Sequence, residues 1–324
     1  MNMNERILAI FEQNPDVFVS GEQLSEQLKC SRTAIWKHIR ELKEQGYEFE
    51  AVSRKGYRLI RKPDRLSAIK LMAALQTRKL GRTIKLLDEV DSTQIVAQKL
   101  AEEGAAEGTL VIAEQQNAGR GRMGKPWHSP KGKGIWMSIV LRPTTPMHFT
   151  PQLTLLAAVA VCRAIRKLAP LPVAIKWPND LLIDGRKVCG ILLESFAEDE
   201  RLRYVIAGIG ISVNLEPDDY PDYLEPIATS LRIAAGKQLD RTALIALVLE
   251  ELEQLYELYQ ESGFPPIRAA WEALTISIGR TVRGMTSKGE VTGVAESIDD
   301  MGALLVRTSD GETVKLYTAE IQTL

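Results

Sequence analysis

The sequence predicts an α+β protein with several domains: a small basic helical domain, a central α/β domain with a mixed, mostly antiparallel sheet, and a small C-terminal β-barrel. Three observations lead to this prediction. The chain has 324 residues, which at about 100 to 200 residues per domain corresponds to two or three domains. Charge is unevenly distributed near the N-terminus, and short strands replace helices from about residue 278. A composition of 45% hydrophobic and 26% charged residues, with a net charge of −1, excludes disorder and a uniformly polycationic protein.

Residues 1–62 form the first predicted domain, which is strongly polarised in charge. Residues 1–28 carry one basic and five acidic side chains, whereas residues 29–62 carry ten basic and four acidic ones. Apolar residues at helical spacing start at Ile7, the capping-box pattern at 20–23 starts a second helix, and Ser31 caps a third. The alternating run 47–51, a turn and a second short run then predict a β-hairpin. Three helices followed by a hairpin are the pattern of a winged helix-turn-helix.

The third helix and the hairpin present the candidate DNA-binding residues. In a winged helix-turn-helix one helix enters the major groove, and cations of the wing meet phosphates. We therefore predict that DNA is contacted by the outward helix face and the wing, namely Arg32, Thr33, Trp36, Lys37, Arg40, Arg54, Lys55 and Arg58. The alternative interpretation is a solvated helix face, an ordinary basic hairpin, and Trp36 as a partly buried core residue.

Residues 67–275 form the predicted central domain, after a linker at 61–66 in which Pro63 ends the preceding strand. Strands and helices alternate irregularly here, which argues against a doubly wound sheet. Expected helices are 93–103, 151–168 and 240–260, and expected strands are 84–90, 109–116, 135–141, 173–177, 181–183, 188–194 and 204–211. Residues 276–324 then show short strands between Gly and Asp turns, at 281–283, 290–295, 303–307 and 313–316, which indicate an SH3-like barrel.

Cysteine content and hydropathy bear on the cellular compartment. The three cysteines, Cys30, Cys162 and Cys189, are widely spaced without a C-x-x-C pair, which favours a reduced, cytoplasmic protein. We expect Cys189 to pack within a strand and not to act as a catalytic thiol. The N-terminus lacks the basic end and apolar run of a signal peptide. The most apolar stretch, 153–162, is shorter than the about 18 residues of a membrane span, so no membrane association is expected.

The stretch 119–124 satisfies the dinucleotide-binding pattern G-x-G-x-x-G, but its context argues against that function. A Rossmann loop leads directly into a helix, whereas here Pro126 and Pro130 follow. The stretch instead offers Arg120 and Arg122 in a glycine-flanked loop. Such a loop can close over an anion, because arginine forks onto carboxylate or phosphate oxygens. A flexible surface loop is the alternative interpretation.

Further motifs carry polar residues at strand or helix ends. The run 176–180, Lys-Trp-Pro-Asn-Asp, follows a strand, and its oxygen ligands suit Mg²⁺ bound with a nucleotide; the alternative is a simple turn. Lys187 begins a strand of core residues, where a lysine often serves as a point charge for phosphate. The hydroxyls of Ser92 and Thr93 either cap a helix or bind a polar ligand group. The glycine-punctuated strand 208–214 permits a flat ligand or another backbone to approach closely.

In combination these motifs are more specific than any one of them. Asp91-Ser-Thr, Gln116-Asn-Ala-Gly-Arg-Gly-Arg122, Lys176-Trp-Pro-Asn-Asp180, Arg186-Lys-Val-Cys-Gly-Ile-Leu192 and Gly208-Ile-Gly-Ile211 occur in this order. The sequence resembles biotin protein ligases over essentially its whole length. With the winged helix in front, it resembles the bifunctional biotin ligases and biotin-operon repressors of bacteria.

The resemblance implies an ATP-dependent ligase that works in two steps. Biotin and ATP give biotinyl-5′-AMP and pyrophosphate, and a lysine of a biotin carboxyl carrier protein, that of acetyl-CoA carboxylase or of other biotin-dependent carboxylases, then takes the biotinyl group. The implied catalytic residues are Lys187, Arg122 and Arg120. Biotin would be bound by Ser92, Thr93, Gln94, Gln116, Arg120, Gly121, Arg122 and Lys187, and the nucleotide by Lys176, Asn179, Asp180, Gly208 and Asn214, with Asp180 as the Mg²⁺ ligand.

The resemblance also implies regulation of transcription. Biotinyl-5′-AMP would act as corepressor, promote a homodimer through the central sheet, and let paired winged helices bind double-stranded operator DNA. Two positions depart from the family pattern, since Gln94 follows Ser-Thr and Ser212 precedes Val-Asn where the family usually has Asn. Two alternatives stay open: a lipoate-type protein ligase, and an effector-binding transcription regulator without ligase turnover. Retention of Arg120, Arg122 and Lys187 argues against the second.

Overall fold

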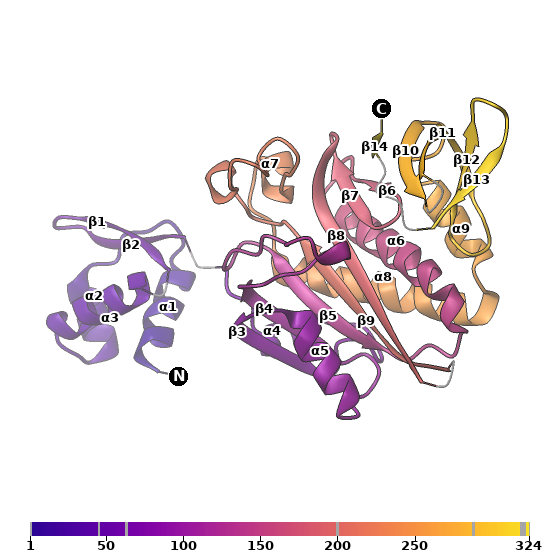
Figure 1. The fold of residues 1–324 in the computed structure, drawn as a ribbon. Helices are drawn as coiled ribbons and strands as arrows, with labels where there is room; N and C mark the ends of the chain where they lie inside the picture. The colour runs from indigo at the N-terminus through magenta and orange to yellow at the C-terminus, as the bar shows by residue number, and fades with distance from the viewer. Residues whose placement is uncertain are drawn as a thin grey trace. The chain divides into compact units, whose positions relative to one another are not determined.

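The computed structural model describes residues 2–44, 46–61, 64–198, 201–286, 289–317 and 322–323. The chain divides into two compact units, Met1–Arg65 and Leu66–Leu324 (Figure 1). Positions 62 and 63 of the predicted linker lie outside the described residues. The C-terminal strands belong to the second unit, and the domain boundaries expected at 62 and 276 stay predictions.

The first unit is a winged helix-turn-helix, as predicted. Its elements are the helices α1 (Met3–Gln13), α2 (Gly21–Leu28) and α3 (Arg32–Glu44) and the antiparallel strands β1 (Glu48–Val52) and β2 (Gly56–Arg61). The predicted capping box is confirmed, because the Ser20 hydroxyl accepts from the Gln23 N–H and the Gln23 side chain accepts from the Ser20 N–H. One apolar core holds the unit together, namely Ile7, Phe11, Val19, Leu24, Leu28, Ile35, Ile39, Leu42 and Phe49.

The second unit is built on a seven-stranded sheet. Its strands are β3 (Ile84–Val90), β4 (Leu110–Gln116), β5 (Ile135–Leu141), β6 (Ala174–Lys176), β7 (Asp180–Ile183), β8 (Arg186–Glu198) and β9 (Arg201–Ile211). The order across the sheet is β3-β4-β5-β9-β8-β7-β6. β3 and β4 run parallel, and every other neighbouring pair of these described strands is antiparallel. The predicted mixed, mostly antiparallel sheet is therefore confirmed.

Helices cover both faces of this sheet. On one face α5 (Thr93–Glu102) packs Ala97 and Ala101 against Val111 of β4. The other face packs on α6 (Thr150–Leu168) and α8 (Arg241–Ser262), with α9 (Pro265–Glu272) beside them (Figure 1). Successive side chains of β4 point to opposite faces of the sheet. Val111 therefore packs with α5, whereas Leu110 and Ile112 belong to the core on the side of α6 and α8. The shorter helices are α4 (Ala68–Ala74) and α7 (Leu231–Ala235).

Helix α6 contains the apolar stretch 153–162 and extends well beyond it. With the preceding turn it forms a helical segment, Met147–Leu168, which is the one segment of the described residues long and apolar enough to cross a membrane. Of its most apolar window, 67% is buried inside the protein. Packing of α6 in the core shared with α8 therefore accounts for its apolar composition.

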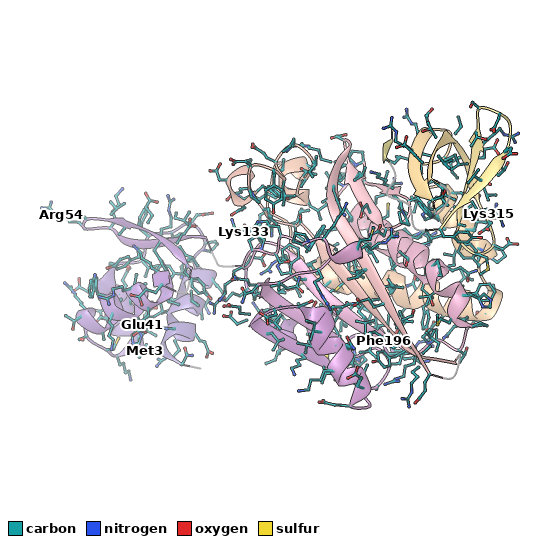
Figure 2. All side chains as sticks on the ribbon, in the orientation of Figure 1. Met3, Glu41, Arg54, Lys133, Phe196 and Lys315 are labelled. Carbon is teal, nitrogen blue, oxygen red and sulfur yellow. The ribbon has the colours of Figure 1, made fainter. Side chains whose placement is uncertain are left out.

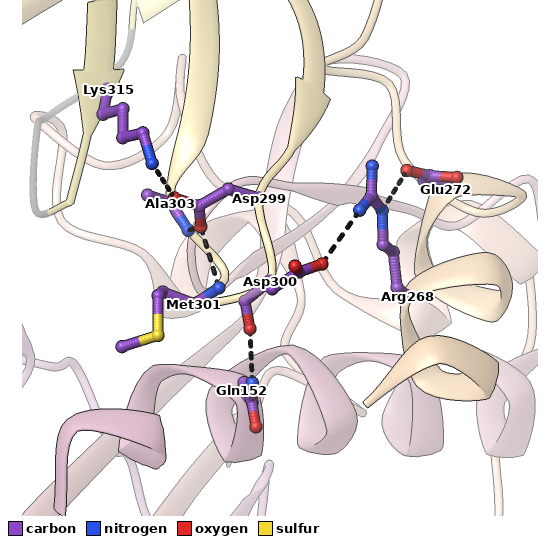
Figure 3. A network of polar contacts seen from close by, with 8 residues as sticks. All are labelled: Gln152, Arg268, Glu272, Asp299, Asp300, Met301, Ala303 and Lys315. Atoms are coloured by element: carbon purple, nitrogen blue, oxygen red, sulfur yellow. Dashed lines mark hydrogen bonds and ion pairs between the residues drawn. The ribbon is translucent and has the colours of Figure 1, made fainter. Parts of the chain in front are cut away.

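The C-terminal part of the second unit is a five-stranded antiparallel sheet. Its strands are β10 (Thr281–Thr286), β11 (Gly289–Ile298), β12 (Leu304–Thr308), β13 (Thr313–Leu316) and β14 (Gln322–Thr323), in the order β13-β12-β11-β10-β14. The four predicted strands correspond to β10–β13. Figure 3 shows how the turn after β11 docks: the Gln152 amide of α6 donates to the Asp300 carbonyl, and Arg268 of α9 pairs with the Asp300 carboxylate.

Candidate active site

A cavity of about 510 Å³ lies in the second unit, within the range of about 300–1,000 Å³ that is usual for small-molecule sites. Its walls come from the start of α5, from β8 and β9, from residues 117–134, which we call the arginine loop, and from residues 220–228, which we call the cavity wall. Predicted site residues that line it are Ser92, Thr93, Gln94, Gln116, Arg120, Gly121, Arg122, Lys176, Asn179, Asp180, Lys187 and Gly208. The structure thus brings together motifs that are scattered along the chain.

Asn214 is the predicted site residue that does not line the cavity. It is buried, and its side-chain amide exchanges hydrogen bonds of 2.9 and 3.0 Å with the backbone of Leu239. The side chain therefore anchors the residues that precede α8.

One end of the cavity is uncharged and polar. The Thr93 hydroxyl lies 3.1 Å from Oε1 of Gln116 and 2.9 Å from the hydroxyl of Ser138, which in turn lies 3.0 Å from Oε1 of Gln94. Ser92 occupies the N-cap position of α5, but its side chain makes no capping hydrogen bond. This chain of small polar groups suits a neutral ligand group that both donates and accepts hydrogen bonds.

Three glycines keep the floor of the cavity open to side chains. A Cβ at Gly208 would lie 2.5 Å from Oε1 of Gln94, and one at Gly210 would lie 2.4 Å from Nε1 of Trp127. One at Gly190 would lie 3.0 Å from the same indole. The sequence predicts that a ligand or another backbone approaches the strand 208–214 closely. In the structure, side chains make this approach, because Gln94 lies against Gly208 and the Trp127 indole of the arginine loop rests on β8 and β9.

Two cations that line the cavity, Arg122 and Lys187, bond to the neighbouring residues Asn179 and Asp180. Nη1 of Arg122 donates to Oδ1 of Asn179 at 3.0 Å, whereas Nζ of Lys187 lies 2.7 Å from Oδ1 of Asp180 and 5.2 Å from the Trp127 ring centroid. Burial lowers the pKa of the Arg122 guanidinium below its usual value, and the Asp180 carboxylate partly offsets that effect. A charged group that has lost part of its hydration gains strongly from an anionic ligand.

The arginine loop owes its shape to its backbone. The Gly121 N–H donates to the Lys125 carbonyl at 2.7 Å, and Met123 adopts a φ of 56°. A single 3₁₀ turn, Arg122–Gly124, follows the glycines before the chain extends again. The expectation that no Rossmann-type helix starts here is therefore confirmed. Arg120 is exposed at the cavity rim, where it is accessible to a ligand.

The donor set fits a magnesium ion only if the ligand supplies most of the coordination. Among the described residues no group of three or more His, Cys, Asp or Glu side chains is arranged to hold a metal. Asp180 lines the cavity and offers one carboxylate. Mg²⁺ bound with a nucleotide commonly takes one or two carboxylates, phosphate oxygens and water. Asp180 alone is compatible with that arrangement.

Several residues that line the cavity carry no recognisable signal in the sequence. Ser138 lies inside an apolar strand, and the cavity wall reads as a loop without a recognisable motif. Within that wall, burial raises the pKa of Tyr220 to about 12, and the nearby Ser212 hydroxyl acts in the opposite direction. Cys189 is buried, and burial raises the pKa of its thiol, so it packs as expected and is a poor nucleophile.

The candidate DNA-binding residues lie in the first unit and differ in their intramolecular partners. Three of the cations already pair with carboxylates, namely Arg32 with Glu22, Arg40 with Glu44 and Arg58 with Glu50. Lys37, Arg54 and Lys55 are exposed, and Arg54 lies at the tip of the hairpin (Figure 2). Trp36 is 57% exposed beside Arg40, which excludes its interpretation as a core residue.

Three family models match successive parts of the chain. They are an HTH domain over residues 4–58, the biotin/lipoate A/B protein ligase family over residues 86–212, and the biotin protein ligase C-terminal domain over residues 277–323. The bifunctional ligase/repressor BirA of Bacillus subtilis (strain 168) is 49% identical over 320 residues, which are 99% of this chain and 98% of that protein. The chain belongs to the bifunctional ligase/repressor family.

Other similar proteins support this family membership. The bifunctional ligase/repressor BirA of Escherichia coli (strain K12) is 34% identical over 89% of this chain and 88% of its own length. The solved structure of the biotin protein ligase from Aquifex aeolicus in complex with biotin and ATP covers 75% of this chain and 100% of its own, with 28% identity and a TM-score of 0.66. Membership of the ligase/repressor family confirms the predicted domain order and favours a ligase over a regulator without turnover.

Proposed function

We propose that the protein is an ATP-dependent biotin ligase that forms biotinyl-5′-AMP, transfers biotin to a carrier-protein lysine, and also represses transcription. The observation that carries the ligase proposal is a single cavity in which an uncharged polar end adjoins two cations, Arg122 and Lys187. A carboxylic acid with a polar neutral head group matches this layout. The complex of the Aquifex aeolicus enzyme with biotin and ATP supports biotin and ATP as the two ligands.

Adenylation requires positioning and charge neutralisation, and no enzyme nucleophile. A carboxylate oxygen of biotin attacks the α-phosphorus of ATP, and the bond to the bridging oxygen breaks, so that pyrophosphate leaves with the bonding electrons. Lys187 exchanges Asp180 for the substrate and neutralises charge that builds on the carboxylate and α-phosphate. Arg120 and Arg122 hold the same two anionic groups from the arginine loop.

Contacts to the rest of each ligand follow from the two ends of the cavity. The biotin head group is assigned to the polar end, where Ser92, Thr93, Gln94 and Gln116 lie. Gly121 of the arginine loop lines the same cavity and is assigned to biotin by sequence pattern. The nucleotide is assigned to Lys176, Asn179, Asp180 and, by sequence pattern alone, Asn214. The sequence pattern also assigns Gly208 to the nucleotide, but a Cβ at Gly208 would meet Gln94, so we assign Gly208 to the polar end. Asp180 would hold Mg²⁺ through one carboxylate oxygen, and the bound ion would neutralise charge on the triphosphate.

The second step transfers biotin to a protein. The ε-amine of a carrier lysine attacks the acyl carbon of biotinyl-5′-AMP, AMP leaves, and the amine gives up a proton as the amide forms. We assign the biotin carboxyl carrier protein of acetyl-CoA carboxylase, and carriers of other biotin-dependent carboxylases, as acceptors. A relative from Paracoccus denitrificans, 37% identical over 71% of this chain and 96% of its own length, is named biotin--[acetyl-CoA-carboxylase] ligase.

The winged helix-turn-helix supports the repressor half of the proposal. Its exposed helix face and wing carry cations suited to phosphate contacts. Biotinyl-5′-AMP serves as corepressor because it favours a homodimer whose two winged helix-turn-helix units bind operator DNA. We assign the protein to the cytoplasm, with no membrane partner. The adenylate is then both a reaction intermediate and a signal.

Pyrophosphate release tests the ligase half first. Purified protein is incubated with ATP and Mg²⁺, and either biotin or lipoate is the added acid. Biotin-dependent release with retained biotinyl-5′-AMP is the expected result. Release with lipoate alone would move the protein to the lipoate ligases, and no release with either acid would leave a ligand-sensing regulator. The retained complex is then titrated onto operator DNA at several salt concentrations.

A further inference from the structure

The 3₁₀ turn Pro217–Asp219 is fixed to the arginine loop at two points. The Asp219 carboxylate lies 2.9 Å from Nζ of Lys133, near the end of the loop. The Asp219 carbonyl accepts from Nε2–H of His128 at 2.7 Å. Glu216 reinforces the turn, because its N–H donates to the Asp219 carboxylate at 2.7 Å and its own carboxylate lies 3.5 Å from Nζ of Lys133.

These contacts join two segments that bound the cavity but are distant in sequence. Trp127 immediately precedes His128, and Tyr220 immediately follows Asp219; both Trp127 and Tyr220 line the cavity. Lys133 and Asp219 themselves do not line it. Their effect on a bound ligand must therefore pass through the two segments that they hold together.

The charge pair is placed where solvent weakens it only in part. The side chains of Lys133 and Asp219 are each 24% exposed. Exposed pairs contribute little because water and salt screen them, and partial burial reduces that screening. Lys131 provides a natural comparison in the same loop, since it pairs with Asp88 of β3 and its side chain is 44% exposed.

We propose that Lys133 and Asp219 are positioning residues that hold the cavity wall 220–228 against the arginine loop and so retain biotinyl-5′-AMP until transfer. The inference rests on the proposed ligase function. An intermediate that escapes is hydrolysed without reaching the carrier, so retention determines how much ATP is consumed per biotin transferred. Loss of the Lys133–Asp219 pair separates the cavity wall from the arginine loop, so that biotinyl-5′-AMP can leave the cavity. The residues that contact the reacting atoms are unchanged.

The test measures adenylate release and coupling in the full-length protein. Lys133→Met and Asp219→Asn are each expected to release labelled biotinyl-5′-AMP about fivefold faster than the unchanged protein. The ratio of pyrophosphate formed to biotin transferred to a carrier domain rises with them. The double variant releases the adenylate no faster than the worse single variant, because each side chain acts through the other. Lys131→Met and the charge-conserving Lys133→Arg keep the original rate and ratio.

Different outcomes separate the two proposals. If the unchanged protein forms no adenylate with biotin, the ligase function fails and the positioning role fails with it. If the unchanged protein forms and retains the adenylate while Lys133→Met releases it at the same rate, the positioning role alone is wrong. A variant that merely folds poorly lowers pyrophosphate formation and transfer together, so its coupling ratio stays unchanged, which also overturns the proposal.

Discussion

Replacing Gly208 with alanine tests how the polar end of the cavity is held. The new Cβ would lie 2.5 Å from Oε1 of Gln94 and 3.2 Å from the carbonyl oxygen of Leu192. The end of the glutamine must therefore move. It is held on both sides, because Nε2 donates to the Ile206 carbonyl at 3.1 Å and Oε1 accepts from the Ser138 hydroxyl at 3.0 Å. Only 3% of Gln94 is exposed, so water cannot replace these partners.

The magnitude follows from the hydrogen bonds that are lost. A buried hydrogen bond between neutral groups contributes about 1 kcal/mol, and an orphaned partner costs about 1 to 3 kcal/mol. Loss of both Gln94 bonds is then worth about 2 kcal/mol, or about a 30-fold change in a binding constant. Ser138 also bonds the Thr93 hydroxyl, so the disturbance reaches residues assigned to biotin. We expect Gly208→Ala to bind biotin about 30-fold more weakly and ATP nearly as before.

Calorimetric titrations with biotin and with ATP and Mg²⁺ measure both affinities. Gly21→Ala is the matched control, since a Cβ there meets nothing within 4 Å. Adding Gln94→Asn to Gly208→Ala shortens the amide by one methylene and should restore part of the biotin affinity. Unchanged biotin binding by Gly208→Ala would refute the reasoning. Weaker ATP binding alone would instead support the assignment of Gly208 to the nucleotide.

Four further predictions concern charged residues. Lys187→Ala should lower the adenylation rate constant about 100-fold or more while weakening biotin binding far less, which single-turnover kinetics resolves. Arg241→Met removes the cationic partner of the buried Glu114, whose carboxylate then keeps only the Leu66 N–H among its partners in the described residues, and should lower the free energy of unfolding by about 3 to 5 kcal/mol in a denaturant titration. Burial raises the pKa of the Glu253 carboxyl group. Hydrogen bonds from the backbone N–H groups of residues 78–80 outweigh that effect and lower the pKa below its usual 4.5. The resulting stability is present above the unfolded-state pKa and is lost as pH falls through the folded-state pKa, and Glu253→Gln should remove this acid dependence from unfolding titrations. Arg54→Ala should weaken DNA binding similarly for all sequences and reduce the salt slope by about one.

Each of these predictions has an outcome that contradicts it. Equal losses of rate and biotin affinity would make Lys187 a ground-state contact. A loss of less than about 1 kcal/mol in Arg241→Met would mean that the Leu66 N–H and water suffice to stabilise the Glu114 carboxylate. Parallel acid profiles for Glu253→Gln and the unchanged protein would locate the acid sensitivity elsewhere. A salt slope that does not change in Arg54→Ala would remove the wing tip from the phosphate contacts.

Short-range sequence patterns predicted most of the helices and strands, because the hydrogen bonds and turns that define these elements join residues close together in the sequence. The capping box at 20–23 and the short strands between Gly and Asp turns in the C-terminal sheet are examples. Helix α9 escaped prediction because it starts with two prolines. A proline pair ordinarily interrupts helices, yet the first helical turn needs no N–H donors from those positions. In the folded protein, the packing of Ile267 and Trp271 into the core stabilises this segment as a helix.

The candidate site was predictable where one motif contains several of its residues, and unpredictable where it depends on strand register. Ser138 is invisible in the run 135–141, because every residue of that strand is buried. Its role follows from pairing of β5 with β9, which places Ser138 opposite Gly208. A slip of one residue would turn Ser138 to the other face of the sheet and place Met137 or Ile139 against Gln94. The polar end of the cavity therefore exists only in the folded register, since the missing side chain at Gly208 admits Gln94 and the facing strand supplies the hydroxyl that holds it.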